Sequence, residues 1–488
     1  MMMIELHDNS LLQTGLFIGG DWRKAGTGET FSVTDPATGD VVAECAKGSV
    51  EDAEAAIAAA EAARFDWAAR PAKERAGILE NFYRLIVENA DDLAQILTAE
   101  QGKPLAEARG EILYGAAFFE WYAEEAKRVY GETIPAPSRG QRMLVLRQPI
   151  GVCAAITPWN FPMAMIARKA APALAAGCTM VLKPATATPL SALALGELAR
   201  RAGVPDGVFS IVPGPASTVG DTLVASDAVR KITFTGSTDV GRSLMSRAAG
   251  NIKKLSLELG GNAPVLVFED ADIDVAVRGA IASKFRNAGQ TCVCANRIYV
   301  HDAIYDRFSE AFTRAVKAMK VGAGTEAGAE IGPMIDEAAL EKVEEHVSDC
   351  VDKGGTVAAG GQRHALGGTY YEPTVLTGAT QSMLIAHEET FGPVAPLFRF
   401  SDEAEAIQLA NDTEYGLAAY LFTRDAARQW RVGEALDFGV VGVNTGITSY
   451  EGAPFGGMKA SGVGREGSRH GIDEFLETKY LCIGEIGS

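Results

Sequence analysis

The sequence predicts an α/β protein in which helices cover both faces of a parallel sheet. The prediction rests on alternating short apolar and helical segments after Gly151, where strands alternate with helices as they do in parallel sheets. The strands are expected at 152–156, 179–182, 208–212, 231–234 and 265–267. The helices are expected at 163–176, 189–202, 241–249 and 273–285. A second α/β region is expected from about 292 to 455.

Length and charge limit the possible functions. A chain of 488 residues is too long for one hydrophobic core, so two or three domains are expected. Hydrophobic residues make up 47% and charged residues 22%, as in an ordinary globular enzyme. The net charge of −18 argues against nucleic acid and anionic membranes as partners. An anionic substrate remains compatible, because a local basic pocket can form in an acidic protein.

Cysteine usage and the N-terminal segment indicate a location inside the cell. The seven cysteines are odd in number and scattered, which is not a disulfide framework. Cys292 and Cys294 have no second pair or nearby His, so no metal site is expected. The first basic residue is Arg23, and no apolar run approaches the roughly 20 residues of a membrane span. A cytoplasmic location is therefore expected.

The N-terminal third predicts mainly helices. A strand and turn at 17–22 precede helices at 50–64, 71–89, 91–101 and 107–130. Acidic residues in the first turn of the 50–64 helix suit its dipole. The last of these helices carries an aromatic stripe that we interpret as core packing: Tyr114, Phe118, Phe119, Trp121 and Tyr122. Further strands are expected at 143–149 and 475–483.

Two short stretches carry the residues expected to react. Cys292 follows Gly-Gln-Thr, a flexible polar lead-in that suits an exposed loop. A thiol nucleophile needs a base to become a thiolate. Glu258 lies between Leu257 and Leu259, just before two glycines, and apolar neighbours raise a carboxyl pKa toward neutral pH. The spacing alone does not show that the two side chains meet.

These two stretches resemble the signatures of the aldehyde dehydrogenase superfamily, and the resemblance extends from about Gly19 to the last ten residues. It implies a Rossmann-type parallel-sheet cofactor domain at 1–126 and 148–258, and an α/β catalytic domain at 259–458. It also implies a small β oligomerisation element at 127–147 and 459–488, through which a homo-tetramer forms as a dimer of dimers.

The resemblance implies a reaction through a thioester. The Cys292 thiolate attacks an aldehyde, and the Asn160 amide and the Cys292 N–H hold the oxygen anion. Asn160 lies in a loop stiffened by two prolines, although a structural turn is the alternative reading. Hydride then leaves to a nicotinamide, and Glu258 activates the water that releases the acid. No metal is required.

A dinucleotide site is expected after the 231–234 strand. Gly236 and Gly241 form a Gly-x-x-x-x-Gly turn, which by itself fits any strand–turn–helix connection. The resemblance places Gly236, Ser237 and Gly241 at the pyrophosphate, at a helix N-terminus. It also assigns Glu389 and Phe391 to the nicotinamide side of the cofactor, and includes Trp159 and Leu259 among the cofactor-binding residues.

Lys183 and Thr186 bear on the choice of cofactor. The resemblance places Lys183 near the adenine ribose, although it could also be a surface lysine. Relatives specific for NAD commonly carry a Glu where this chain has Thr186, and that carboxylate repels a 2′-phosphate. NADP, or use of both cofactors, is therefore favoured over strict NAD.

Three residues indicate a carboxylate on the substrate. Arg168, Arg286 and Ser449 match the clamp of succinate-semialdehyde dehydrogenases, and Arg suits bidentate carboxylate binding. The two arginines could instead form structural ion pairs. Glutarate semialdehyde would use the same clamp, since one methylene changes binding by only about 1–3 kcal/mol. A broad-specificity aldehyde dehydrogenase is a further alternative.

Other hypotheses concern regulation and reaction class. Cys294 could form a reversible disulfide with Cys292 as a redox switch, or be a neutral small residue. A CoA-acylating enzyme would usually lack Glu258, and a non-catalytic structural protein would be expected to lose Cys292 or Glu258. The pathway could be 4-aminobutyrate breakdown, lysine breakdown or detoxification.

Overall fold

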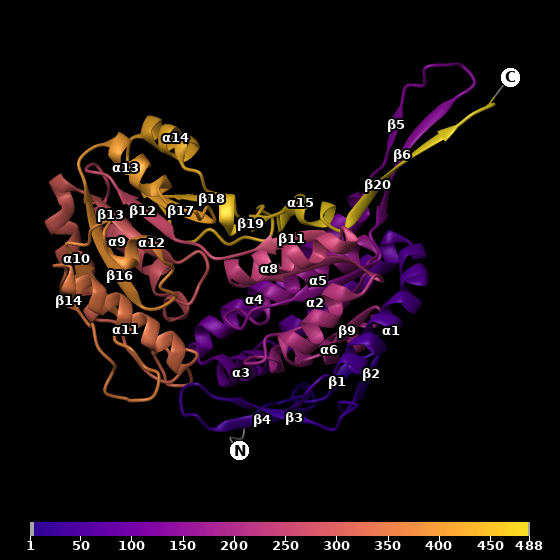
Figure 1. Cartoon of the computed structure of the whole chain (residues 1–488), viewed down its shortest axis with the longest axis horizontal. Helices are drawn as coiled ribbons and strands as arrows, with labels where there is room; N and C mark the ends of the chain where they lie inside the picture. Colours follow the sequence, from indigo (N-terminus) through magenta and orange to yellow (C-terminus); the bar gives the residue numbers. More distant parts are fainter. Residues whose placement is uncertain (1–3, 487–488) are drawn as a thin grey trace.

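The computed structural model describes residues 4–486 and is built mainly on two large sheets (Figure 1). The first has eight strands, in the order β19 (Gly462–Val463), β11 (Lys254–Glu258), β10 (Val229–Thr235), β7 (Val152–Ile156), β8 (Thr179–Lys183), β9 (Phe209–Ile211), β1 (Leu16–Ile18) and β2 (Asp21–Arg23). Strands β11, β10, β7, β8 and β9 are mutually parallel. The predicted parallel α/β sheet is therefore confirmed.

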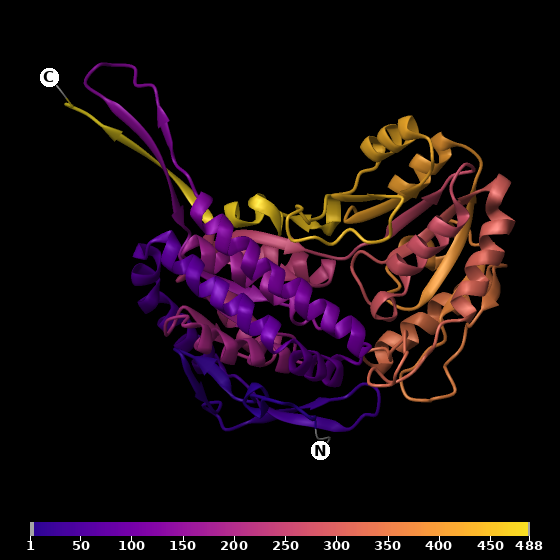
Figure 2. The ribbon, with the colours of Figure 1, turned by 180° about the vertical axis from the view of Figure 1, so that it is seen from behind.

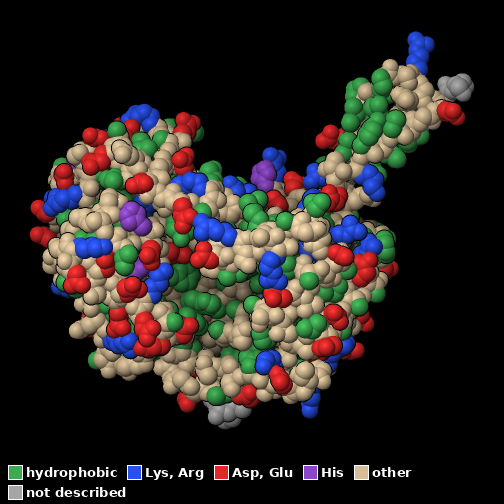
Figure 3. All heavy atoms as spheres, viewed as in Figure 1, with side chains coloured by type: hydrophobic (Ala, Val, Ile, Leu, Met, Phe, Trp, Pro, Cys, Tyr) green, Lys and Arg blue, Asp and Glu red, His purple; other side chains and the backbone are tan. Residues whose placement is uncertain are grey.

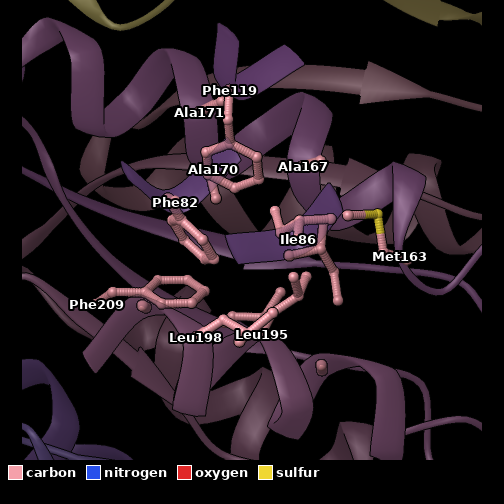
Figure 4. Close-up of a cluster of buried hydrophobic side chains, with 14 of the residues drawn as sticks. Phe82, Ile86, Phe119, Met163, Ala167, Ala170, Ala171, Leu195, Leu198 and Phe209 are labelled. Carbon is pink, nitrogen blue, oxygen red and sulfur yellow. The ribbon is translucent and has the colours of Figure 1, made fainter. Parts of the chain in front are cut away.

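Helices cover both faces of this sheet because its buried strands are apolar on both sides. Alternate residues of β7 enter different core clusters: Val152, Ala154 and Ile156 in one, Cys153 and Ala155 in the other. The first cluster is completed by α1 (Val50–Ala69), α7 (Asp221–Ala225) and α8 (Thr238–Ala248). The second is completed by α2 (Ala72–Glu88), α3 (Ala90–Gln101), α4 (Leu105–Glu125), α5 (Ala164–Ala176) and α6 (Leu190–Ala202), part of which Figure 4 shows.

The second sheet has seven strands, in the order β14 (Thr356–Ala359), β15 (Thr374–Thr377), β16 (Val394–Phe400), β13 (Ala295–His301), β12 (Ala263–Val267), β17 (Ala418–Phe422) and β18 (Val440–Val443). All neighbours except β14 and β15 are parallel. Helices α9 (Ile273–Lys284) and α10 (Tyr305–Lys317) share one core cluster with it. The other cluster takes residues from α11 (Glu337–Asp352), α12 (Leu384–His387), α13 (Glu403–Asn411) and α14 (Ala426–Ala435).

A three-stranded arm projects from the body of the molecule, as Figures 1 and 2 show from opposite sides. It consists of β20 (Leu476–Ile483), β6 (Arg142–Pro149) and β5 (Glu132–Ile134), all antiparallel. Hydrophobic side chains gather on its surface in Figure 3, and Tyr480 and Leu481 are 55% and 40% exposed. We call β5, β6 and β20 the arm.

The division into domains stays a prediction, and one strand departs from it. The segment 459–488 does not lie wholly in the arm, because β19 pairs with β11 in the first sheet through Leu257 and Val463. Helix α15 (Ser468–Asp473) follows it and packs on α4 and α5. A separate two-stranded sheet joins β3 (Thr30–Thr34) and β4 (Val41–Ala46). None of the described helices combines the length and apolar character that crossing a membrane requires.

The aromatic stripe of α4 is only partly core. Phe118, Phe119 and Tyr122 are buried, as expected. Tyr114 and Trp121 are partly buried and pack against the same core, and Tyr114 also lines a cavity. Tyr114 lies one turn before Phe118 and makes an edge-on contact with its ring at 5.1 Å between centroids. The stripe therefore passes from the core at one end to a cavity wall at the other.

The packing in Figure 4 yields a stability prediction. Phe82 is fully buried, and its ring lies 4.2 Å from that of Phe119. Phe82→Ala should cost about 3–5 kcal/mol through lost burial and a residual cavity. The midpoint of the first urea unfolding transition should fall. Phe65→Ala on α1, where Phe65 is 67% exposed, should change stability by only about 0.5 kcal/mol. Equal effects of the two substitutions would contradict this view of the core.

Candidate active site

The first sheet presents its site residues at the carboxyl ends of neighbouring strands. Glu258 ends β11, Gly236 follows β10, and Asn160 lies in the loop after β7. These strands are adjacent in the sheet order, so their ends lie side by side. Ligands bind at this edge in open parallel α/β sheets. Glu258, Gly236 and Asn160 therefore lie near one another at this edge of the sheet.

The second sheet supplies further residues of the site from the opposite side. Residues 259–262 cross directly from β11 to β12, which joins the two sheets. Cys292 precedes β13, and Glu389 and Phe391 precede β16, the strand that pairs with β13. The amino ends of the second sheet thus face the carboxyl ends of the first. Side chains that are far apart in the sequence meet between them.

Two cavities meet at Cys292, which lines both. The first has a volume of about 290 Å³, and its wall includes Arg168, Arg286 and Ser449. The second has a volume of about 230 Å³, and its wall includes Asn160 and Glu389. We call them the substrate cavity and the cofactor cavity. A thiol at their junction can contact one molecule on each side.

The substrate cavity has two arginines with different surroundings. Arg168 is buried; its Nε lies 2.9 Å from the Glu466 carboxylate, and its guanidinium carbon lies 3.9 Å from the Phe455 ring centroid. Its Nη2 has no hydrogen-bond partner among the described residues. Arg286 is only partly buried, and its guanidinium lies 5.2 Å from the Phe161 ring centroid. Arg168 thus forms an ion pair and also faces the cavity.

The cofactor cavity is lined by six of the nine residues predicted for the cofactor: Trp159, Gly236, Ser237, Leu259, Glu389 and Phe391. The rings of Trp159 and Phe391 meet edge to face, with centroids 5.7 Å apart. Ser237 precedes the first residue of α8, and its side chain makes no capping hydrogen bond within the described chain. The open N-terminus of this eleven-residue helix suits a phosphate. These residues fit a bound dinucleotide.

Glu389 lies against the crossover between the sheets. Its carboxylate accepts a hydrogen bond from the Gly261 N–H at 3.2 Å. A Cβ at Gly260 would lie 2.9 Å from the other carboxylate oxygen, so glycine allows this close approach. Burial raises the pKa of Glu389 to about 7, although the Gly261 hydrogen bond opposes the shift.

The other three predicted cofactor residues lie outside this cavity. Lys183 is buried, not a surface lysine; its Nζ donates to the Pro184 carbonyl at 3.0 Å, and burial lowers its pKa to about 8. Thr186 donates to the Gly214 carbonyl at 3.3 Å. Gly241 packs in the first turn of α8, where a Cβ would lie 2.4 Å from Leu259. Their assigned roles toward the cofactor stay predictions.

The loop before β13 that carries Cys292, which we call the nucleophile loop, is a tight turn that separates the thiols of Cys292 and Cys294. The Cys294 N–H donates to the Thr291 carbonyl at 3.0 Å. Cys294 is buried, and its Sγ lies 3.2 Å from the Lys284 carbonyl, whereas Cys292 borders both cavities. A disulfide between them would have to break the contact with Lys284. The redox switch stays a prediction.

Burial raises the pKa values of both Cys292 and Glu258. Desolvation raises the pKa of Cys292 to about 12, while the positive charge of Arg168 lowers it. Burial raises the pKa of Glu258 well above its ordinary value, and the negative charge of Glu466 adds to the shift. The Glu258 Oε2 has no hydrogen-bond partner in the described part of the chain. After losing its proton, Cys292 can act as a nucleophile and Glu258 as a base.

Glu466 is a functional candidate that the sequence did not reveal. Its carboxylate pairs with both Arg168 and Lys169, and Lys169 also donates to the Thr235 hydroxyl at 2.6 Å. Burial raises the pKa of Glu466, but the two cations outweigh it and bring the pKa below its usual value. Glu466 lies in a glycine-rich segment far along the chain, so no local pattern marks its contact with residues 168 and 169.

Asn160 lies in the wall of the cofactor cavity beside Cys292. Its Nδ2 donates to the Gln290 carbonyl at 2.9 Å. An amide nitrogen carries two hydrogens, so one remains for a ligand. The neutral donor and the thiol therefore lie at one cavity, an arrangement that suits addition of the thiol to a carbonyl group. Among the described residues, no group of three or more acidic, His or Cys side chains could hold a metal ion.

Comparison with known proteins decides the family. The model of the aldehyde dehydrogenase family matches residues 22–481. The chain belongs to the aldehyde dehydrogenase family. The family and the fold predicted from the sequence are therefore confirmed, and the catalytic roles of Cys292 and Glu258 stay predictions.

Characterised aldehyde dehydrogenases similar to this chain span nearly its whole length. It is 60% identical to the 3-sulfolactaldehyde dehydrogenase of Pseudomonas putida, over 99% of this chain and 100% of that protein. It is 58% identical to the NADP-dependent succinate-semialdehyde dehydrogenase GabD of Escherichia coli K12, with the same coverage. The crystal structure of succinate-semialdehyde dehydrogenase from Burkholderia pseudomallei matches with a TM-score of 0.97 at 58% identity, covering 98% and 99% of the two chains.

The raised pKa of Cys292 predicts slow alkylation of this aldehyde dehydrogenase at neutral pH. Only the thiolate reacts, so the rate at Cys292 should rise about tenfold per pH unit between pH 7 and 10. Peptide mapping after timed iodoacetamide treatment would follow Cys292, with the exposed Cys482 as internal reference. A Cys292 rate that stays constant from pH 7 to 9 would mean that the thiolate is already present at rest.

Proposed function

We propose that this enzyme oxidises succinate semialdehyde to succinate with NADP or NAD through a thioester on Cys292. The observation that carries the proposal is the position of Cys292 between two cavities, one of which has two arginines in its wall. An aldehyde bound from the arginine side would place its carbonyl carbon at the thiol. A hydride acceptor bound from the other side would face the same carbon.

The residues of this chain act in a definite order in this proposal. The Cys292 thiol releases its proton to solvent, its sulfur attacks the aldehyde carbon, and the Asn160 amide donates to the resulting oxygen anion. A bound nicotinamide ring would supply the acceptor for the hydride of this carbon, and loss of that hydride would leave the carbonyl of a thioester on Cys292. Glu258 then accepts a proton from water, whose oxygen attacks the thioester. Succinate leaves, and the Cys292 thiol is restored.

The substrate carboxylate is assigned to Arg286, Arg168 and Ser449, which share the cavity wall. Arg168 already faces Glu466, so Arg286 supplies the less compensated charge, while the unpartnered Nη2 of Arg168 remains available as a donor. The relative that acts on 3-sulfolactaldehyde also takes an aldehyde with an anionic group. Glutarate semialdehyde, one methylene longer, is the second candidate because the same clamp suits it.

The remaining assignments extend this proposal. The exposed apolar side chains of the arm support assembly as a homo-tetramer, a dimer of dimers. The scattered unpaired cysteines support a cytoplasmic location. An enzyme with the proposed activity would serve 4-aminobutyrate degradation.

A substrate comparison tests the proposed function. With NADP, kcat/KM for succinic semialdehyde should exceed that for butanal by roughly a hundredfold, because only the former pairs with Arg286. Arg286→Met should remove most of this preference. Arg278→Met, on the exposed side of α9, is the matched control and should leave it intact. Equal values for the two aldehydes in the parent enzyme would indicate a broad-specificity enzyme, and glutarate semialdehyde tested alongside separates the two semialdehydes.

A single substitution tests the cofactor assignment. Thr186→Glu should lower the ratio of kcat/KM for NADP to that for NAD by about tenfold or more, because a carboxylate repels the 2′-phosphate and binds ribose hydroxyls. Thr27→Glu adds the same charge at an exposed site and should leave the ratio unchanged. An unchanged ratio in Thr186→Glu would place the adenine ribose elsewhere.

A further inference from the structure

Three charged residues at the start of α4 face the active site from the helical layer. Glu107 and Glu111 are spaced four apart on one side of α4, and Lys103 lies in the short segment just before the helix. All three line the substrate cavity. Charged groups are rarely buried unless they are paired, so their position calls for a physical reason.

Lys103 and Glu111 form a buried ion pair that holds both ends of the Asn160 loop. The Lys103 Nζ lies 2.6 Å from a Glu111 carboxylate oxygen, and each side chain is 1% exposed. The same Nζ donates to the Asn160 carbonyl at 2.7 Å. The other Glu111 oxygen accepts from the N–H groups of Met163 and Ala164, at 3.0 and 3.1 Å. The pair therefore fixes residue 160 and the N-terminus of α5 together.

The same face of α4 also holds the nucleophile loop. Glu107 accepts from the Asn287 N–H at 2.8 Å, and Asn287 has a left-handed backbone with a φ of 52°. The Asn287 amide donates to the Asn160 carbonyl at 3.0 Å and to the Gln290 carbonyl at 3.2 Å. The Asn160 amide donates to that Gln290 carbonyl as well. The two loops that carry Asn160 and Cys292 are thus fastened to each other and to one helix.

We propose that Lys103, held by Glu111, is a positioning residue that aims the Asn160 amide at the oxygen anion formed on Cys292. This inference rests on the proposed function, in which Asn160 supplies that donor. Lys103 acts on the backbone of Asn160 and not on the substrate. Its ammonium satisfies the Asn160 carbonyl, fixes the peptide plane and leaves the side-chain amide free to face the thiol.

Position matters here because hydrogen-bond stabilisation of an oxygen anion depends steeply on geometry. A displacement of about 1 Å in a reacting group can slow a reaction by about a hundredfold. Loss of one oxyanion donor has a similar effect, about 100–1,000-fold in kcat. A Lys103→Met variant should therefore lower kcat although its own side chain never contacts the aldehyde.

The competing explanation is that the ion pair only stabilises the fold. Removing one member of a buried pair leaves the other uncompensated, so a single substitution lowers stability in either case. The double variant Lys103→Met/Glu111→Gln removes both charges and should recover most of the loss in Tm. If Lys103 positions Asn160, kcat stays low in this double variant although Tm recovers.

A double-mutant cycle gives the decisive measurement. Lys103→Met and Asn160→Ala should each lower kcat for succinic semialdehyde by about a hundredfold, and the combined variant should be no slower than Asn160→Ala alone. KM for NADP should change by less than about threefold in Lys103→Met, because Lys103 itself does not line the cofactor cavity. Tm is recorded for every variant.

Lys231→Met is the matched control. Lys231 is also fully buried, with its Nζ 2.5 Å from the Ser256 hydroxyl and 3.5 Å from Glu474, but it lies near the opposite end of β10. Lys231→Met should lower Tm but keep kcat within about threefold of the parent, as expected for a structural contact.

Three results would overturn the positioning role: unchanged kcat in Lys103→Met, recovery of kcat together with Tm in the Lys103→Met/Glu111→Gln variant, or additive losses in the cycle. Failure of the parent enzyme to oxidise the semialdehyde would instead overturn the proposed function. Full activity of Asn160→Ala would remove the oxyanion role and the positioning role together.

Discussion

The close approach of the two sheets at the crossover from Glu258 to Asn262 is the constraint on which the active site depends. A Cβ at Gly261 would lie 2.4 Å from the Cys292 carbonyl oxygen, so only glycine allows the nucleophile loop to reach the first sheet. A Cβ at Gly260 would lie 2.9 Å from a carboxylate oxygen of Glu389. The nucleophile loop and Glu389 both approach the crossover closely because it has glycine there. The two sheets therefore form one site although each has its own cores.

Buried charged side chains around Cys292 are the second feature that shapes the active site. Around Cys292 the charged side chains occur in compensated groups, Lys103 with Glu111 and Glu466 with Arg168 and Lys169. Such pairing offsets part of the cost of burying charge in a medium of low dielectric constant. Glu258 and Glu389 form no ion pair among the described residues, and burial raises the pKa of both.

The sequence predicted what depends on local pattern. Apolar strands such as β7 were located residue by residue, and the Cys292 and Glu258 motifs led to the family. It did not predict contacts made by distant segments: the joining of β19 to the first sheet, the pairing of Glu466 with Arg168, or the cavity position of Tyr114. Lys103, Glu107 and Glu111 carried a detectable signal, a four-residue spacing of charge before and along a largely apolar helix. Only the structure shows which loops they hold.

The pairing of β6 with β20 has a consequence for the order in which the protein is made. Eight residues of β20 complete a sheet whose other strands precede them by more than half of the chain. On the ribosome, β5 and β6 therefore wait as an open, apolar edge until residues beyond 476 have been synthesised. The first sheet likewise waits for β19 at its own edge. The arm should consequently be the last part of the molecule to be completed, and its open edge stays exposed to other chains until then.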